Sequence, residues 1–431
     1  MVGRLNDCGY LAEGKPAITL VIGGFHSMLL LTRHRAVRLA ACISVLLSAG
    51  CAVITPRNAL PEATAMRIEP AGFHDIRYWG DEAAPDANSS GPGLERVASQ
   101  QWKRAATGRE LNLLAISGGA EDGAFGAGLL AGWGDSGKRP TFDLVTGVSS
   151  GALIAPFVFL GREHDNQLRE IFTRYGRKDI FQYNVPSLLE GSALVDDSPL
   201  SHLIEKYVDS EFIREVARER AKGRVLLIGT TNLDAQRPVL WDMGRIAASE
   251  NAEALDLFRK VLLASATLPG VFAPVRIKVR VGGNDYDELH VDGGVTRQVF
   301  IAPSTLRLLT GNAVGRMAGR SRLFIVRNGR VDPRWETVSD NVLSVTQRSL
   351  STLIKNQGIG DLYRIYSITK QEGIEFNLAS IPADFDAKMD EPFDQKYMTA
   401  LFDRGYEMSS RGYPWVKNLP GLQAAYQPPR L

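Results

Sequence analysis

Short apolar runs alternate with segments of helical periodicity from residue 110 onward. The apolar runs predict strands at 111–116, 142–146, 225–229, 289–291 and 323–326. The helical periodicity predicts helices at 125–133, from residue 150 onward, and at 252–263, 342–366 and 393–408. Strands that alternate with helices are joined by right-handed crossovers, which favour a parallel sheet covered by helices. The pattern therefore predicts an α/β fold, a three-layer sandwich with a mostly parallel central sheet.

These elements define one α/β domain at residues 108–420. Its core is expected at 110–300 and a C-terminal helical part at 330–420. Residues 52–107 are rich in Pro, Ala, Asp and Ser, and the stretch 86–92 (DANSSGP) shows no periodicity. We therefore expect an N-terminal extension or linker before the domain.

The first 51 residues have the three-part layout of a secretory signal. A basic stretch at 33–38 precedes an apolar stretch at 39–47, and small residues then lead to Cys51. Residues 48–51 (SAGC) resemble a bacterial lipobox, whose cysteine is lipidated and becomes the new N-terminus, although serine stands where leucine is commoner. Met28 is the expected start, because it places the basic stretch where a signal needs it.

An uncleaved membrane anchor with a buried cysteine is the alternative interpretation of this segment. The apolar stretch is too short for it, because a spanning helix needs about 20 apolar residues. We therefore expect a bacterial cell-envelope protein anchored in the membrane through a lipid on Cys51.

Composition excludes several other classes of protein. Of the 431 residues, 44% are hydrophobic, which suffices for a large core. The net charge of +2, without a run of Lys and Arg, does not favour nucleic-acid binding. All three cysteines lie within the first 51 residues, so the body has no disulfide framework, and no histidine spacing suggests a metal site. We expect no metal and no cofactor.

The chain has one GxSxG motif, residues 147–151 (GVSSG). It follows a predicted strand and precedes a predicted helix, which is the setting of a nucleophile elbow. Glycines allow the backbone to turn tightly without side-chain clashes. Ser149 is therefore the candidate nucleophile, whereas Ser150 lies one residue into the helix and should point elsewhere.

A catalytic serine needs a base, and the histidines are poorly placed for that role. In α/β-hydrolases an acid and then a histidine follow the serine. His290 is the last histidine of the chain, so such a triad would need an acid between Ser149 and His290. His164 and His202 lie in polar stretches that are typical of the surface.

Asp292 is the better candidate for the base. An apolar strand ends in Asp292-Gly293-Gly294, which places a carboxylate at a sheet edge. Such a turn alone is more often structural, because Asp-Gly is frequent in turns. Its combination with the serine motif favours a catalytic role. The remaining carboxylates Asp143, Glu121 and Asp122 are interpreted as structural.

A glycine-rich turn at 117–123 (SGGAEDG) links the first strand of the domain to a helix. Its free N–H groups could stabilise an anion. A nucleotide-binding phosphate loop is the alternative, but no GK[ST] follows the glycines, which argues against it.

These three elements, in this order, resemble the patatin-like phospholipases, and in particular bacterial lipoprotein members. Residues 230–234 (TTNLD) and 264–274 (ASATLPGVFAP) look like further segments of that family. The resemblance covers roughly residues 110–300.

The resemblance implies a lipid acyl hydrolase with a serine–aspartate dyad and no catalytic histidine. Ser149 would attack an acyl ester, and Asp292 would accept its proton and later activate water. The oxyanion would lie on backbone N–H groups of Gly118, Gly119 and Ala120.

The resemblance also implies a lipid substrate at a membrane surface. The motif glycines that it assigns are Gly123, Gly147, Gly151, Gly293 and Gly294. One residue departs from the family pattern: Asp122 stands where many members carry Arg or Lys, which weakens the case for anionic headgroups. Two alternatives stay open, an acyltransferase on the same dyad and a membrane-anchored binding protein without turnover.

Overall fold

The computed structural model of the chain describes residues 57–62, 69–81, 110–183, 195–269, 271–301, 321–333, 335 and 337–419. The predicted signal and lipobox at 1–51 and the stretch 86–92 of the predicted linker lie outside these residues. The described residues belong to one compact unit that starts at Arg57. Among them, no helix combines the length and apolarity needed to cross a membrane.

A mostly parallel sheet forms the centre of this unit. Its strands are β1 (Arg77–Trp79), β2 (Leu111–Ile116), β3 (Leu144–Val148), β6 (Val225–Asn232), β7 (Arg237–Asp242), β8 (Val275–Val281), β9 (Asn284–Asp292), β10 (Ser321–Arg327) and β11 (Glu375–Ser380). The order is β1-β7-β6-β3-β2-β10-β11, with β9 on β6 and β8 on β9. Strands β6, β3, β2, β10 and β11 are parallel, and β7, β1 and the β8–β9 hairpin add antiparallel pairs beside them. β4 (Gln182–Tyr183) and β5 (Val195–Asp196) form a separate short pair.

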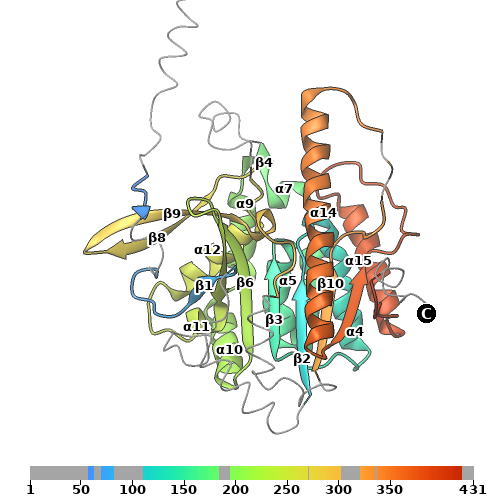
Figure 1. Ribbon diagram of the computed structural model, residues 1–431, viewed down its shortest axis with the longest axis horizontal. Coiled ribbons are helices and arrows are strands. Elements are labelled where there is room, and N and C mark those ends of the chain that lie inside the picture. The colour runs from blue at the N-terminus through green and yellow to red at the C-terminus, as the bar shows by residue number, and fades with distance from the viewer. Residues whose placement is uncertain are drawn as a thin grey trace, which may run out of the picture. The chain divides into compact units, whose positions relative to one another are not determined.

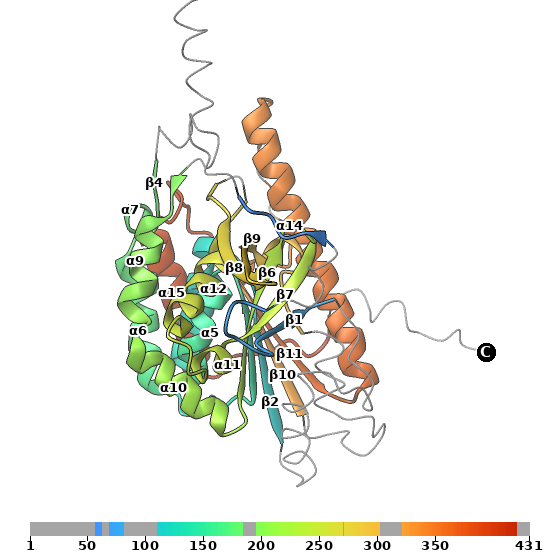
Figure 2. The same cartoon turned by 90° about the vertical axis from the view of Figure 1, so that its left-hand side faces the viewer.

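Helices cover both faces of the sheet. They are α4 (Gly123–Asp135), α5 (Ser150–Leu160), α6 (Asp165–Arg174), α7 (Arg177–Ile180), α9 (Ser198–Tyr207), α10 (Ser210–Ala221), α11 (Met243–Ala247), α12 (Ala254–Ala266), α14 (Val342–Gln371) and α15 (Gln395–Ser410), with 3-10 turns η1 (Ala120–Asp122), η2 (Arg162–His164) and η3 (Gly293–Val295). Two perpendicular views show α14 on one face and α5, α6, α10 and α12 on the other (Figures 1 and 2). The predicted three-layer α/β sandwich is confirmed.

The parallel strands are buried on both faces. In β2, Leu114 and Ile116 belong to the core shared with α4 and α5, whereas Leu113 and Ala115 belong to the core shared with α14. Successive side chains of a strand point to opposite faces. Burial on both sides therefore explains why these strands appear in the sequence as continuous apolar runs.

The sheet extends into the region expected to be an extension or linker. Arg77–Trp79 forms β1, which pairs with β7 through Arg77↔Trp241 and Trp79↔Val239. The compact unit therefore begins before residue 108, and part of the extension completes the sheet edge.

The β8–β9 hairpin is longer than the strand predicted at 289–291. β9 has 9 residues and pairs with β8 from Asn284 to His290. Gly282 and Gly283 join the two strands with φ values of 56° and 85°, as a two-residue hairpin turn requires. The hairpin brings Asp292, the last residue of β9, onto β6.

Candidate active site

Ser149 occupies a strained elbow between β3 and α5. Its φ of 56° and ψ of −128° are unfavourable for a residue with a side chain. The Ser149 N–H donates to Ser265 Oγ at 3.0 Å, and the Ser265 hydroxyl donates to the Gly229 carbonyl at 2.7 Å. These contacts with α12 and β6 hold the serine in its unusual conformation.

The two glycines of the motif are required by close approach of the backbone. A Cβ on Gly147 would lie 2.4 Å from the carbonyl oxygen of Gly151, and a Cβ on Gly151 would lie 2.4 Å from that of Ile116. The positive φ belongs to Ser149 itself. The glycines therefore let β2, β3 and α5 meet, and Ser149 carries the strain.

Strand β6 brings the ends of β3 and β9 together. Along one of its edges β6 pairs with β3 as far as Val148↔Gly229, and its next residue, Thr230, pairs with Asp292 of β9. The other edge of β6 is occupied by β7. Ser149 and Asp292, which are 143 positions apart (292 minus 149), therefore end two strands at neighbouring positions of one edge.

Asp292 is buried, with 4% of its surface exposed. Its carboxylate accepts a hydrogen bond from the Gly294 N–H at 2.7 Å. Burial raises the pKa of Asp292 to about 6, because a low-dielectric site disfavours the charged form, and interactions with the Ser149 side chain and the Gly294 N–H lower it only in part. The fold thus brings the two predicted dyad residues next to each other.

The glycine-rich turn lies against the elbow. A Cβ on Gly118 would be 2.9 Å from Ser149 Cβ, and one on Gly119 would be 2.1 Å from the Asn328 carbonyl oxygen. Within the described part of the chain, the N–H groups of Gly118, Gly119 and Ala120 donate no hydrogen bond. Free amides beside a nucleophile are what an oxyanion hole needs.

Ser150 is packed away from this site. Its side chain meets Gly123, where an added Cβ would lie 2.6 Å from Ser150 Cβ. Its hydroxyl is buried and has no hydrogen-bond partner among the described residues. Ser150 therefore makes no contact that could activate it.

His290 is fully buried, and both of its ring nitrogens are engaged. Nδ1 lies 3.0 Å from Thr230 Oγ1 and Nε2 lies 3.1 Å from Glu288 Oε2. His164 contacts Gln167 and Glu215 at the surface instead, and His202 is exposed. No described histidine is hydrogen-bonded to Ser149.

Residues that the sequence did not single out position the site. Asn328 donates from Nδ2 to the Ser117 carbonyl at 2.8 Å and accepts at Oδ1 from the Gly126 N–H at 3.0 Å. Gln298 donates from Nε2 to the Gly294 carbonyl at 3.2 Å, and its own N–H donates to Asp361 at 2.9 Å. These residues follow β9 and β10 and become site residues only through the fold.

A cation lies near Asp122, the position that departs from the family pattern. Asp122 accepts a hydrogen bond from the Tyr397 hydroxyl at 2.6 Å. It also interacts electrostatically with Arg327, a buried residue at the end of β10. Burial lowers the pKa of Arg327, and Asp361 and Asp122 oppose that shift. Arg327, at the end of β10, thus supplies a positive charge that interacts with Asp122 in the glycine-rich turn.

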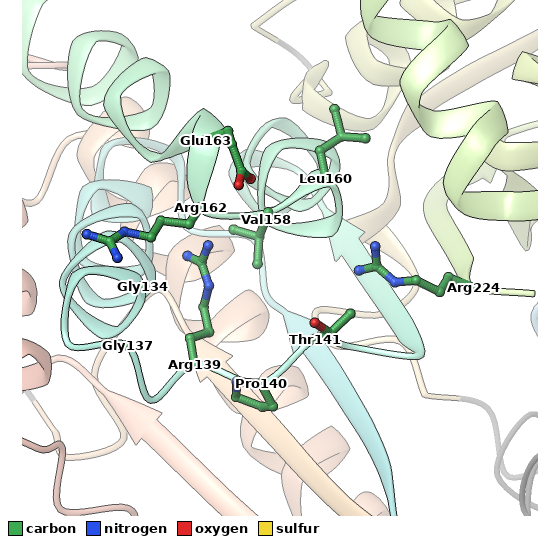
Figure 3. Close-up of a pocket in the computed structure, with 11 residues that line it drawn as sticks. Gly134, Gly137, Arg139, Pro140, Thr141, Val158, Leu160, Arg162, Glu163 and Arg224 are labelled. Carbon is green, nitrogen blue, oxygen red and sulfur yellow. The ribbon is translucent and has the colours of Figure 1, made fainter. Parts of the chain in front are cut away.

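A cavity of about 300 Å³ lies at the amino ends of the parallel strands. It is lined by Arg139, Arg162, Glu163 and Arg224, among others (Figure 3). Arg139 and Arg224 precede β3 and β6, whereas Ser149 and Asp292 lie at the other end of these strands. The cavity is therefore separate from the site. The described residues include no cluster of three or more His, Cys, Asp or Glu side chains suited to a metal.

Comparisons with known proteins agree with this geometry. Residues 114–303 match the family model for patatin-like phospholipases, and the match spans the glycine-rich turn, Ser149 and Asp292. This similarity over residues 114–303 supports a lipid acyl hydrolase in general terms. No curated protein matches the chain. The crystal structure of VipD from Legionella pneumophila aligns over 71% of this chain and 67% of that chain, at 10% identity and a TM-score of 0.31, a similarity too weak to inform on activity.

Proposed function

We propose that this chain is a serine acyl hydrolase that cleaves acyl ester bonds of lipids at a membrane surface. The pairing of β6 with both β3 and β9, which places Ser149 beside the buried carboxylate of Asp292, carries the proposal. The strained φ of Ser149 supports it, as do the amides of Gly118, Gly119 and Ala120, which donate no hydrogen bond to any described residue. Strain of this kind clusters at functional sites.

The proposed reaction has two steps on one dyad. Ser149 Oγ attacks the ester carbonyl while Asp292 accepts its proton, and the amides of Gly118 and Gly119 stabilise the oxyanion. The intermediate collapses to an acyl-enzyme, and the proton on Asp292 passes to the leaving alcohol. Asp292 then removes a proton from water, which attacks the acyl-enzyme; the C–O bond to Ser149 breaks, the proton passes from Asp292 to Ser149 Oγ, and the fatty acid is released.

The proposed setting is the bacterial cell envelope. The lipobox-like residues 48–51 would provide a lipid on Cys51. A lipid anchor would keep the enzyme at the surface of its substrate, where an ester in a bilayer is accessible without extraction into water.

The dyad is tested by hydrolysis of a soluble ester, p-nitrophenyl butyrate, with Ser149→Ala, Asp292→Asn and the double variant. Each single variant should lose about 10³-fold or more in kcat, and the double variant should be no worse, because residues that act as a unit are not additive. Ser149→Ala should also lose labelling by a fluorophosphonate probe. Ser150→Ala is the matched control and should keep wild-type activity.

The same assays separate the alternatives. Near wild-type turnover by a folded Asp292→Asn variant would show that Asp292 is only a turn residue. A wild-type chain that neither hydrolyses esters nor reacts with the probe would be a binding protein. An acyltransferase would form a new ester when an alcohol acceptor is added, and the hydrolase would release mainly fatty acid.

A further inference from the structure

The N-terminal half of α14 exposes apolar side chains. Val342, Val345, Leu350 and Leu353 are 85%, 47%, 44% and 69% exposed. At 100° per residue they fall within one arc of about 140° on the helix. Together with Trp335, 93% exposed in the preceding loop, they are called here the α14 stripe.

The length of α14 explains why this stripe has no partner in the fold. The helix has 30 residues, or about 45 Å, whereas the 6 residues of the neighbouring β11 span only about 20 Å. The buried residues of α14, such as Leu362 and Ile365, lie in its C-terminal half. No described residue of 342–357 is buried. The first half therefore extends past the ends of the strands (Figures 1 and 2).

The stripe lies at the carboxyl ends of the parallel strands, where Ser149 and Asp292 also lie. α14 follows β10 and returns to the start of the parallel strand β11, so its N-terminal end is at the carboxyl ends of the strands. Gln357 Nε2 donates to the carbonyls of Thr296 at 2.5 Å and Val295 at 3.4 Å, in and beside η3, the turn that follows Asp292. Val295 is itself 44% exposed. The apolar surface thus continues to the turn beside the active site.

The charge of this half-helix is complementary to an anionic surface. Residues 342–360 contain Arg348 and Lys355 and no Asp or Glu. An exposed helix with an apolar arc, basic residues and a neighbouring tryptophan has the composition of helices that lie in a membrane interface. Contiguous exposed apolar residues in a water-facing protein mark interaction sites.

We propose that the α14 stripe inserts into the interface of an anionic phospholipid bilayer and presents the Ser149–Asp292 site to it. The proposal rests on the proposed function, since it names the surface through which that site meets its lipid. The position of Arg57, the first described residue, agrees with an orientation in which the carboxyl ends of the strands face the membrane. Arg57 forms a 2.7 Å ion pair with Asp234, two residues beyond β6 at the same edge. Arg57 is six positions after Cys51, so a lipid on Cys51 would hold Arg57 within about 20 Å of the membrane.

The test uses the full chain with Cys51→Ser throughout, so that no lipid anchor contributes. The variant carries Val342→Asp and Leu353→Asp, and the control carries Val416→Asp, which changes a valine that is 42% exposed outside the stripe. Two substrates are compared: soluble p-nitrophenyl butyrate, and phospholipid vesicles of phosphatidylglycerol and phosphatidylcholine. Flotation with the same vesicles measures binding without activity.

The variant should lose about tenfold or more in vesicle hydrolysis and flotation, because membrane affinity scales with the apolar area that inserts. Its hydrolysis of the soluble ester should stay within about twofold of the control. Vesicles of phosphatidylcholine alone should bind the parent protein more weakly, since they carry no net negative charge to attract the basic residues.

Several results would overturn the proposal. Vesicle flotation equal in variant and control would show that the stripe does not meet lipid. A parent protein that is dimeric, with a monomeric variant that still floats, would identify a second copy as the occupant. Equal loss on both substrates would indicate a disturbed active site. If the parent protein floats with vesicles but hydrolyses neither substrate, the proposed function fails while the docking surface stands.

Discussion

Asp292 can accept a proton only when its carboxylate is ionised, and its burial raises the pKa to about 6. The ionised fraction grows tenfold per pH unit below that value and saturates above it. We therefore expect kcat/KM for a soluble ester to rise from pH 4.5 to about 6 and then to level off. The measurement is a pH profile of p-nitrophenyl butyrate hydrolysis by the wild type. A flat profile between pH 5 and pH 7 would contradict a proton acceptor with this pKa.

The half-buried Glu121 is a second acid whose ionisation would overlap that profile. Burial raises the pKa of Glu121, in the glycine-rich turn, to about 7. Glu121→Gln keeps the size of the side chain and removes its titration. The rise of kcat/KM near pH 6 should persist in this variant. If the rise disappears, it is caused by ionisation of Glu121 and not of Asp292.

At the level of single residues, the sequence predicts the candidate dyad residues better than the residues that position them. Ser149 and Asp292 stand in short motifs whose glycines mark close backbone approach, and pairing with β6 brings them to neighbouring positions. Ser265, Asn328 and Gln298 stand in no motif. They contact the site through hydrogen bonds between segments far apart in the chain, which local pattern does not encode.

A series of buried polar contacts links β1, β9 and β6. Arg77 pairs with Glu288 at 2.5 Å, and both are nearly inaccessible. Burial alone would raise the pKa of Glu288, but the charge of Arg77 and the hydrogen bond from His290 lower it to about 2. The ionised Glu288 can only accept, so Nε2 of His290 carries the proton and Nδ1 accepts from the hydroxyl of Thr230. Both imidazole nitrogens of His290 are therefore occupied by hydrogen bonds to other residues of the sheet.

His290→Ala should consequently reduce stability and spare catalysis. The cavity and the partners left without hydrogen bonds should cost on the order of 2–4 kcal/mol of unfolding free energy. Ester hydrolysis per folded molecule should stay within a few-fold of the wild type. Urea unfolding and activity at low urea measure the two effects, with His164→Ala and His202→Ala as controls. A folded His290→Ala variant as inactive as Ser149→Ala would restore a histidine triad.

At the level of elements, the parallel strands β2, β3, β6 and β10 were predicted, β9 was predicted only at 289–291, and β1, β7, β8 and the parallel strand β11 were missed. Strands buried on both faces are continuous apolar runs, which is why β2 and β10 could be predicted. β8 (VRIKVRV) alternates strictly between buried and exposed residues, and Gly282-Gly283 follows it directly. That signal was present in the sequence and marks a hairpin. β1 has only 3 residues and gives no such signal, because its place depends on pairing with β7.

For the whole molecule, two independent membrane contacts are proposed, a lipid on Cys51 and the α14 stripe. They differ in strength and in their response to salt. Two or more acyl chains give stable attachment, whereas an interfacial helix binds reversibly and its basic residues are screened by salt. The two contributions can therefore be separated by washing membranes at low and at high salt.

Cys51→Ser should leave the protein without a lipid and release it from washed membranes. We expect the wild type, made in a bacterial host with labelled palmitate, to incorporate label and to stay with membranes in 1 M salt, where screening reduces the Debye length to about 3 Å. Cys51→Ser should incorporate no label, bind weakly at low salt through the stripe, and wash off at high salt. Combining Cys51→Ser with Val342→Asp and Leu353→Asp should abolish the residual binding. A wild type without label, together with a Cys51→Ser variant that resists high salt as the wild type does, would refute the lipid anchor. An unlabelled chain of this kind would be held by a different segment.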